Sequence, residues 1–192
     1  MRLGRRREMQ GILVSAFTEK AKRAVALERV AAAVELIRRY DPAGFRRVQR
    51  GVRRILVSWL PGTWGEYQSE IDLCVLHDEH VVAPETSIAA IASTVVHEAT
   101  HARLIRAGVP YDENLRPRVE RICFRAERAF GRRLPDGHDV VELAERQLAR
   151  KDDFASDDAV WRRLLDSGRK IGFPGWVINW ADRRRQSRRK RP

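Results

Sequence analysis

The chain of 192 residues has 38 lysines and arginines, 26 aspartates and glutamates, and 43% hydrophobic residues. This length and composition fit one globular domain, and no apolar run approaches the roughly 20 residues that cross a bilayer, so we expect a soluble protein with no membrane partner. Two cysteines, Cys74 and Cys123, are too few for a secreted disulfide framework, which favours buried free thiols and the cytoplasm.

Most of the net charge of +12 lies at the two ends of the chain. Residues 1–7 carry four arginines, and residues 183–192 carry seven basic residues, so the body is close to neutral. We therefore predict a basic N-terminal segment over residues 1–17, one domain over residues 18–182 and a basic tail over residues 183–192. The tail predicts at most a weak contact with nucleic acid, since basic tails are usually solvated.

The first half of the chain predicts helix followed by strands. Residues 11–17 are interpreted as the start of a helix, and residues 18–40 have the three- and four-residue apolar spacing of an amphipathic helix that ends at Asp41. Residues 52–60 are rich in Val, Ile, Leu and Trp and predict a strand, and alternation predicts another over residues 70–76. The pair indicates a small sheet ahead of the main helical block.

The second half predicts helices alone. Residues 84–107 lack internal Gly and Pro and end at Gly108, so they predict one long helix, and residues 115–134 predict the next. Shorter helices are predicted over residues 138–150, 157–168 and 174–183. The spacing of Trp161, Trp176 and Trp180 is typical of buried helix-packing residues. The predicted fold class is α+β, mainly helical with a small sheet preceding the long helix.

The long helix contains the sequence His97-Glu98-Ala99-Thr100-His101, which satisfies the pattern H-E-x-x-H. Residues four apart lie one above the other on a helix, so His97 and His101 are placed to hold one zinc ion. Glu98 lies roughly 100° around the helix from His97, where it reaches a water rather than the metal. The motif therefore separates two ligands from a general base.

The remainder of this helix is consistent with an active-site helix. Its predicted core stripe consists of Ile88, Ala92, Val95, Ala99 and Ala102. The histidines lie on another face among small residues that leave room for a cleft, namely Ala90, Ser93 and Thr94. The alternative interpretation is a pair of surface histidines, with Glu98 forming an ion pair with Arg103 or Arg106.

Catalytic zinc usually takes three protein ligands, so a further ligand is required. The downstream candidates are Asp112, Glu113, Glu120, Glu127 and His138. With its H-E-x-x-H motif, the chain resembles the gluzincin group of zinc peptidases, the thermolysin and aminopeptidase type, over roughly residues 52–130. In that group a glutamate from the following helix completes the site. Eighteen residues separate His101 from Glu120, as in the aminopeptidase branch, so the resemblance implies Glu120 as the third ligand.

Two other residues share the predicted helical face of Glu120. Glu127 is the main rival ligand, and Cys123 could bind zinc as a thiolate, although a buried structural thiol is the simpler interpretation. Phe124 stands where thermolysin-like sequences often have an aspartate, which leaves the group that orients a ligand histidine unassigned. A metzincin is excluded because position 107 is alanine and no histidine occurs until His138.

The resemblance implies hydrolysis of peptide bonds in a peptide or protein substrate, with Glu98 moving the proton of the attacking water. A donor to the transition state is expected from Tyr67, Tyr111 or His138, and residues 70–76 could bind an extended substrate at a sheet edge. His77 and His80 are interpreted as part of a polar turn rather than a second metal site. The alternatives are an inactive zincin-like interaction protein and a protease recruited to nucleic acid by its basic tails.

Overall fold

The computed structural model describes residues 6–150 and 156–189 of the chain. Five strands form one mixed sheet in the order β1-β2-β3-β5-β4. Their bounds are β1 Arg6–Met9, β2 Ile12–Phe17, β3 Arg54–Ser58, β4 Gly65–Gln68 and β5 Leu73–His77. The three central strands β2, β3 and β5 run parallel, and the outer strands β1 and β4 pair antiparallel with their neighbours. In the described part of the chain, β4 is therefore an edge strand.

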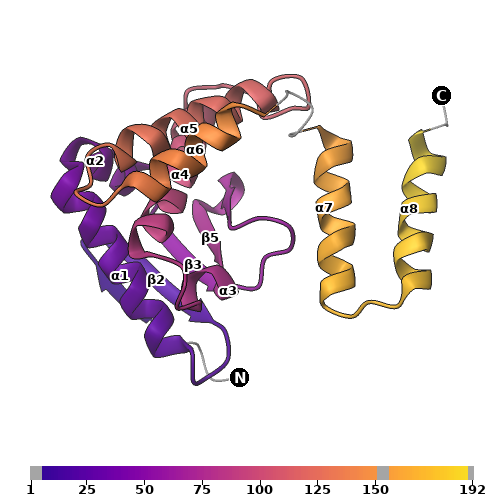
Figure 1. Ribbon diagram of the computed structural model, residues 1–192, viewed down its shortest axis with the longest axis horizontal. Helices are drawn as coiled ribbons and strands as arrows, with labels where there is room; N and C mark the ends of the chain where they lie inside the picture. Colours follow the sequence, from indigo (N-terminus) through magenta and orange to yellow (C-terminus); the bar gives the residue numbers. More distant parts are fainter. Residues whose placement is uncertain (1–5, 151–155, 190–192) are drawn as a thin grey trace.

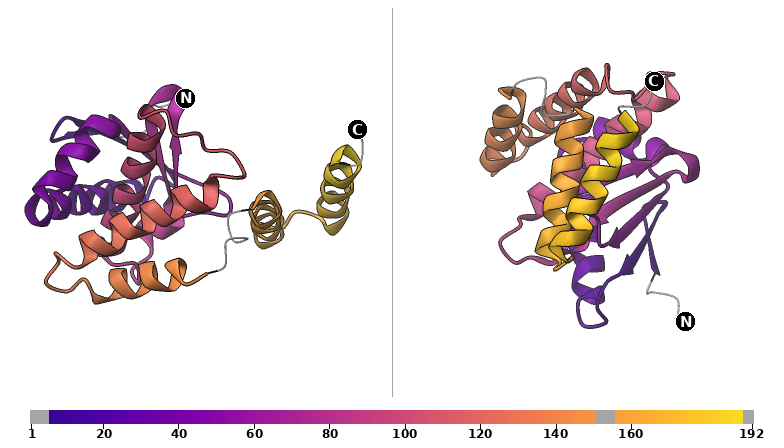
Figure 2. Two further views of the ribbon diagram at one scale, coloured as in Figure 1. Left: turned by 90° about the horizontal axis from the view of Figure 1, so that it is seen from above. Right: turned by 90° about the vertical axis from the view of Figure 1, so that its right-hand side faces the viewer.

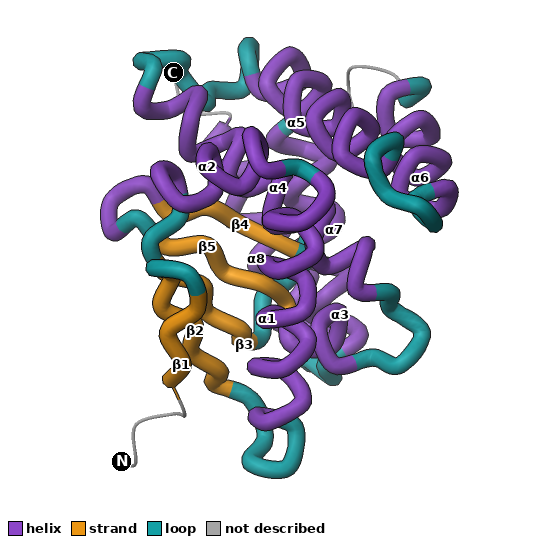
Figure 3. The backbone as a smooth tube through the Cα atoms, turned by 90° about the vertical axis from the view of Figure 1, so that its left-hand side faces the viewer, coloured by secondary structure: helices purple, strands orange, loops and turns teal. Residues whose placement is uncertain are grey.

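Helices surround this sheet unevenly, as Figures 1 and 3 show. The bounds are α1 Arg23–Tyr40, α2 Pro42–Gly51, a short 3₁₀ turn η1 Ser69–Ile71, α3 Asp78–Val82, α4 Ile88–Arg106, α5 Arg116–Gly131, α6 His138–Leu148, α7 Asp157–Lys170 and α8 Gly175–Arg189. Helices α1 and α4 pack on one face of the sheet, α5 packs against α4, and α6 packs against α5. The α+β, mainly helical class predicted from the sequence is thus confirmed.

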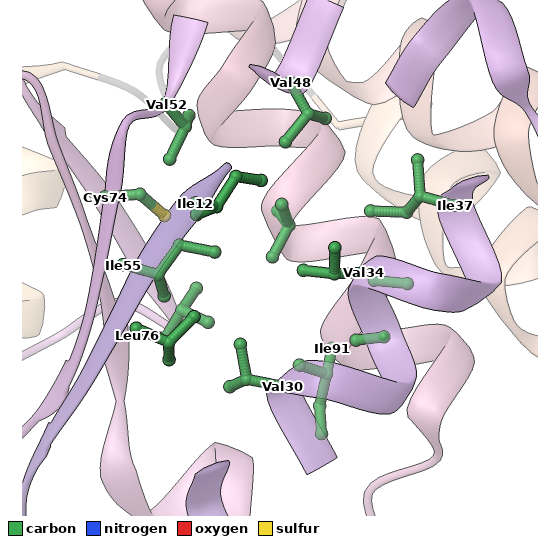
Figure 4. Close-up of a cluster of buried hydrophobic side chains, with 14 of the residues drawn as sticks. Ile12, Val30, Val34, Ile37, Val48, Val52, Ile55, Cys74, Leu76 and Ile91 are labelled. Carbon is green, nitrogen blue, oxygen red and sulfur yellow. The ribbon is translucent and has the colours of Figure 1, made fainter. Parts of the chain in front are cut away.

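The main core lies between the sheet and the α1–α4 layer. Figure 4 shows side chains from the strands facing side chains from α1 and α4, among them Ile12, Ile55 and Leu76 opposite Val34 and Ile91. All five are almost completely buried. The apolar periodicity of each element therefore points toward one shared core, which fixes α4 against the sheet and holds the motif residues in place.

Two predictions for the N-terminal region are wrong. Residues 11–17 do not start a helix, because β2 occupies Ile12–Phe17 with Ile12, Val14 and Ala16 buried in alternation. Residues 6–17 consequently belong to the sheet and not to a separate basic segment, whereas residues 1–5 lie outside the described residues. A short apolar run can form either a strand or a buried helix, and here the parallel pairing with β3 selects the strand.

Most of the other predicted elements are present with shifted ends. The helix over 18–40 begins at Arg23, the strand over 70–76 begins at Leu73, and the long helix over 84–107 begins after the cap residue Ser87. The turn expected at His77–His80 is instead largely the short helix α3. The edge of the sheet expected at residues 70–76 is formed by β4, because β5 lies between β3 and β4.

The C-terminal predictions need two corrections. Helix α8 continues to Arg189, so residues 183–189 are not a tail after the last helix, and residues 190–192 lie outside the described residues. Trp176 and Trp180 are not core residues, because their exposed fractions are 72% and 52%. Across the described residues, the helices include none that is long and apolar enough to cross a membrane.

Candidate metal centre

Helix α4 carries the H-E-x-x-H motif in its second half. The Ser87 hydroxyl caps the helix by accepting a hydrogen bond from the Ala90 amide at 3.0 Å, and the helix then runs unbroken to Arg106. The predicted core stripe is confirmed at its centre, since Ala92, Val95 and Ala102 have no exposed surface. The motif therefore sits on a helix held rigidly by the core.

The two histidine rings converge with the carboxylate of Glu120 from α5. The Nε2 atoms of His97 and His101 are 3.1 Å apart. One oxygen of Glu120 lies 3.2 Å from the His97 Nε2 atom, and its other oxygen lies 3.4 Å from the His101 Nε2 atom. Ligand atoms about 2.0–2.1 Å from a tetrahedral zinc ion are about 3.3 Å from one another. The separation of the two Nε2 atoms is close to this value, and a different oxygen of Glu120 contacts each of them at a similar distance.

Glu127 lies on the opposite side of the His97 ring from Glu120. One of its oxygens is 2.5 Å from the His97 Nδ1 atom, and the other accepts a hydrogen bond from the Ser93 hydroxyl, also at 2.5 Å. Both oxygens are engaged away from the convergent Nε2 atoms. The position of Glu127 is therefore that of a group that orients a ligand histidine, which is the role left unassigned by Phe124. Phe124 itself packs edge-on against the His97 ring.

Cys123 is also close to the histidines. Single ligand atoms from His97, His101 and Cys123 all lie within 4.8 Å of one another, so these three residues could bind a metal ion. Cys123 is completely buried and packs with Leu104 and Val119 beneath the α4–α5 contact. The prediction of a buried thiol is therefore confirmed for Cys123. Cys123 is also an alternative to Glu120 as the third metal ligand.

Glu98 lies under the edge strand β4. It is only 4% exposed, which excludes the surface ion pair considered for it, and Arg106 instead pairs with Asp72 at 2.6 Å. A Cβ atom added at Gly65 would come within 2.8 Å of a Glu98 carboxylate oxygen and 2.6 Å of the Thr94 Cγ2 atom. Only glycine allows the backbone of β4 to approach the proposed general base this closely. Gly65 could not be predicted as a site residue, since one glycine in a polar segment gives no signal.

The electrostatics of the cluster are strongly coupled. Burial by itself lowers the pKa values of His97 and His101, but the nearby Cys123 and Glu120 raise them by more. As a result, the pKa of His97 rises well above its usual value, and that of His101 rises to about 10. Burial opposes ionisation of Glu120 as well, yet its hydrogen bonds with both histidines hold its pKa far below the usual range. Burial raises the pKa of Glu98. The two imidazoles thus sit where a cation is strongly favoured.

The three predicted transition-state donors occupy very different positions. The Tyr111 hydroxyl donates to Glu120 at 2.5 Å, and the Tyr111 ring packs edge-on against His101. The Tyr67 hydroxyl donates to Asp72 at 2.6 Å, on the outer side of the sheet edge. The side chain of His138 is 87% exposed at the start of α6. Of these residues, only Tyr111 contacts the His97–His101–Glu120 cluster.

A second group of aromatic rings lies beside the cluster. Trp64, immediately before β4, stacks on His80 with ring centroids 4.8 Å apart and meets His77 edge-on. The His80 Nε2 atom is 3.4 Å from the Thr94 hydroxyl, and burial lowers the pKa of His80 to about 4. His77 and His80 are not brought together with a third ligand in the described residues.

Comparisons with models of protein families, with curated protein sequences and with solved structures give no match.

Proposed function

We propose that the protein is a zinc-dependent metallopeptidase of gluzincin type, with a zincin-like fold. In this proposal His97, His101 and Glu120 hold the ion and Glu98 is the general base. The observation that carries the proposal is the set of 3.1, 3.2 and 3.4 Å spacings among the two Nε2 atoms and the Glu120 oxygens. Two imidazoles with one carboxylate favour zinc over magnesium or calcium, which prefer oxygen ligands alone.

The ligand set implies a division of labour among the residues of the chain. When bound, zinc supplies a Lewis acid that acidifies a water and polarises a carbonyl. Glu98, whose pKa is raised by burial, takes the proton of the attacking water and returns it to the leaving amine. Glu127 and Ser93 keep the His97 ring oriented, so that its Nε2 atom faces the other ligands.

The edge strand β4 supports a peptide as the substrate. Its outer side has no strand partner among the described residues, and Gly65 brings its backbone against Glu98. An extended peptide added to this edge would place a peptide carbonyl near the proposed base. Recognition through backbone hydrogen bonds would favour an extended peptide over a small ester or amide.

A second candidate function follows from Cys123. If Cys123 joins His97, His101 and Glu120, four protein ligands close the site and leave no position for water, which is typical of structural zinc. The chain would then be an inactive interaction protein stabilised by its metal. The weak nucleic-acid contact predicted from the basic residues of the C-terminus is compatible with either candidate.

The two candidates differ in turnover and not in metal content. The zinc content of the full chain and its cleavage of a peptide library are measured for the wild type, Glu98→Gln, His97→Ala and the surface control Glu142→Gln. The peptidase proposal expects cleavage with about one zinc per chain, zinc without cleavage in Glu98→Gln, neither in His97→Ala, and no change in the control. Undiminished cleavage by Glu98→Gln would reject the base, and zinc without wild-type cleavage would favour the structural site.

A further inference from the structure

Helices α7 and α8 form a hairpin that stands beside the sheet domain, as Figures 1 and 2 show. Ile178 of α8 packs against Gly168 of α7, Leu165 of α7 is buried, and the Trp161 indole donates to Asp182 at 2.9 Å. The start of α7 joins the domain through an ion pair of 2.5 Å between Asp157 and Arg116. The hairpin therefore has a small core of its own and is anchored at one end.

The turn of the hairpin exposes a cluster of large apolar side chains. Ile171, Phe173, Trp176 and Trp180 are 48%, 52%, 72% and 52% exposed. Trp176 and Trp180 are four residues apart, so they lie on the same side of α8. Single exposed apolar residues are ordinary, but four within ten positions, two of them tryptophan, are typical of an interaction surface.

Charge is segregated along this hairpin. Residues 171–181 contain no charged side chain, whereas Arg169 and Lys170 precede them and Arg183, Arg184 and Arg185 follow after Asp182. Residues 156–189 together hold nine basic and four acidic residues, a net charge of +5. The hairpin thus has an apolar turn with basic residues before and after it in the sequence. A partner that fits it must offer an apolar region to the turn and negative charge to the basic residues.

The charge distribution separates three classes of partner. A second copy would bring two hairpins of like charge together, which is unfavourable. A single-stranded nucleic acid is bound by aromatic rings next to cations that follow its backbone. Here Arg184 lies over the Trp180 ring at 5.1 Å, but Trp176, the most exposed ring, is at least six positions from any charged residue in the chain. An anionic bilayer fits both features, since apolar and tryptophan side chains enter the interface while arginines remain at the headgroups.

We propose that the α7–α8 hairpin docks the protein on the surface of an anionic membrane through Phe173, Trp176 and Trp180. This is peripheral binding, consistent with the lack of a membrane-crossing helix among the described residues. It departs from the expectation of no membrane partner, which considered only spanning segments. The proposal is independent of the metal centre, because none of these three residues belongs to the His97–His101–Glu120 cluster.

The test is co-sedimentation of the full chain with lipid vesicles. Vesicles of equal parts phosphatidylcholine and phosphatidylglycerol are compared with vesicles of phosphatidylcholine alone, in low and high salt. Binding is expected only to the anionic vesicles and to weaken with salt, since each basic residue near the surface adds about fivefold. The double substitution Trp176→Ser with Trp180→Ser should reduce partitioning by tenfold or more.

Two further variants control the test. Trp59→Ser removes a tryptophan that is 48% exposed on the sheet domain and should bind vesicles like the wild type. Phe173→Ser, in the connection between the helices, should also weaken binding, and circular dichroism checks that the helices persist, because the Phe173 ring lies near Gly168 of α7. Undetectable vesicle binding, or binding unchanged by the hairpin substitutions, would overturn the proposal. It would also be overturned if these substitutions instead abolished binding to single-stranded DNA or dissociated a dimer.

Discussion

Replacing Glu127 and Glu120 separately by glutamine tests which glutamate contacts the metal. Both Glu127 oxygens are engaged at 2.5 Å, by His97 and by Ser93, so Glu127→Gln leaves the ligand set intact but weakens the charge-assisted hydrogen bond that orients His97. Loss of such a supporting carboxylate typically costs 10–100-fold in metal affinity, or about 1.4–2.7 kcal/mol. Glu120→Gln removes a ligand, and its loss should be larger.

The assay is competition for zinc against a chromophoric chelator, with all variants compared at one pH because protons compete with zinc for both imidazoles. Glu142→Gln is the matched control, since the Glu142 side chain is 53% exposed on α6 and should leave the affinity unchanged. Equal losses in the Glu127 and Glu120 variants, or a larger loss in Glu127→Gln, would refute the assignment of Glu120 as ligand and Glu127 as its support.

Three more predictions concern the surroundings of the cluster. Gly65→Ala should lower peptide cleavage on the order of 100-fold with zinc retained, because the added Cβ atom displaces Glu98. Unchanged cleavage would contradict the close approach of β4 to Glu98. Cys123→Ser should retain stoichiometric zinc, measured by mass spectrometry, if Glu120 is the third ligand, and loss of zinc would instead assign the thiolate. Burial, with His77 and Arg29, lowers the pKa of His80 to about 4 from 6.5, so the unfolded chain binds more protons between these values. Stability should therefore fall by at most about 3 kcal/mol from pH 6.5 to pH 4, and urea unfolding of His80→Gln should lack this part of the decline.

The motif and the helices around it could be predicted because their information is local. Helical geometry alone brings His97 and His101 to one face, and the apolar stripe at Ala92 and Val95 identifies the buried side of α4. Local spacing also predicts the following helix, with Glu120 and Glu127 on one face. How α5 crosses α4 decides whether Glu120 or Glu127 lies against the Nε2 atoms. That packing could not be predicted from a single sequence.

Strands β2 and β4 show the opposite case. Residues 12–17 are a short apolar run whose strand identity depends on pairing with β3, some 40 residues later. Strand β4 has the sequence Gly-Glu-Tyr-Gln, which shows no alternation of apolar and polar residues, and it is an edge strand in the described part of the chain. The closeness of Gly65 to Glu98 arises only when this strand is docked beside α4.

The exposure of Trp176 and Trp180 in the C-terminal hairpin could not be predicted, for a related reason. Their spacing matches that of helix-packing residues, and the sequence does not reveal that α7 and α8 use Leu165 and Ile178 for their contact. Helical periodicity identifies an apolar face but does not say what covers it. That question required the three-dimensional arrangement of the hairpin.

The most direct test of the central claim is X-ray absorption spectroscopy at the zinc edge of the stoichiometrically loaded full chain. Only nitrogen and oxygen neighbours are expected, at about 2.0–2.2 Å, from His97, His101, Glu120 and water. A sulfur neighbour at about 2.3 Å would show that Cys123 closes the site, and failure of the chain to take up zinc at all would contradict the metal centre itself.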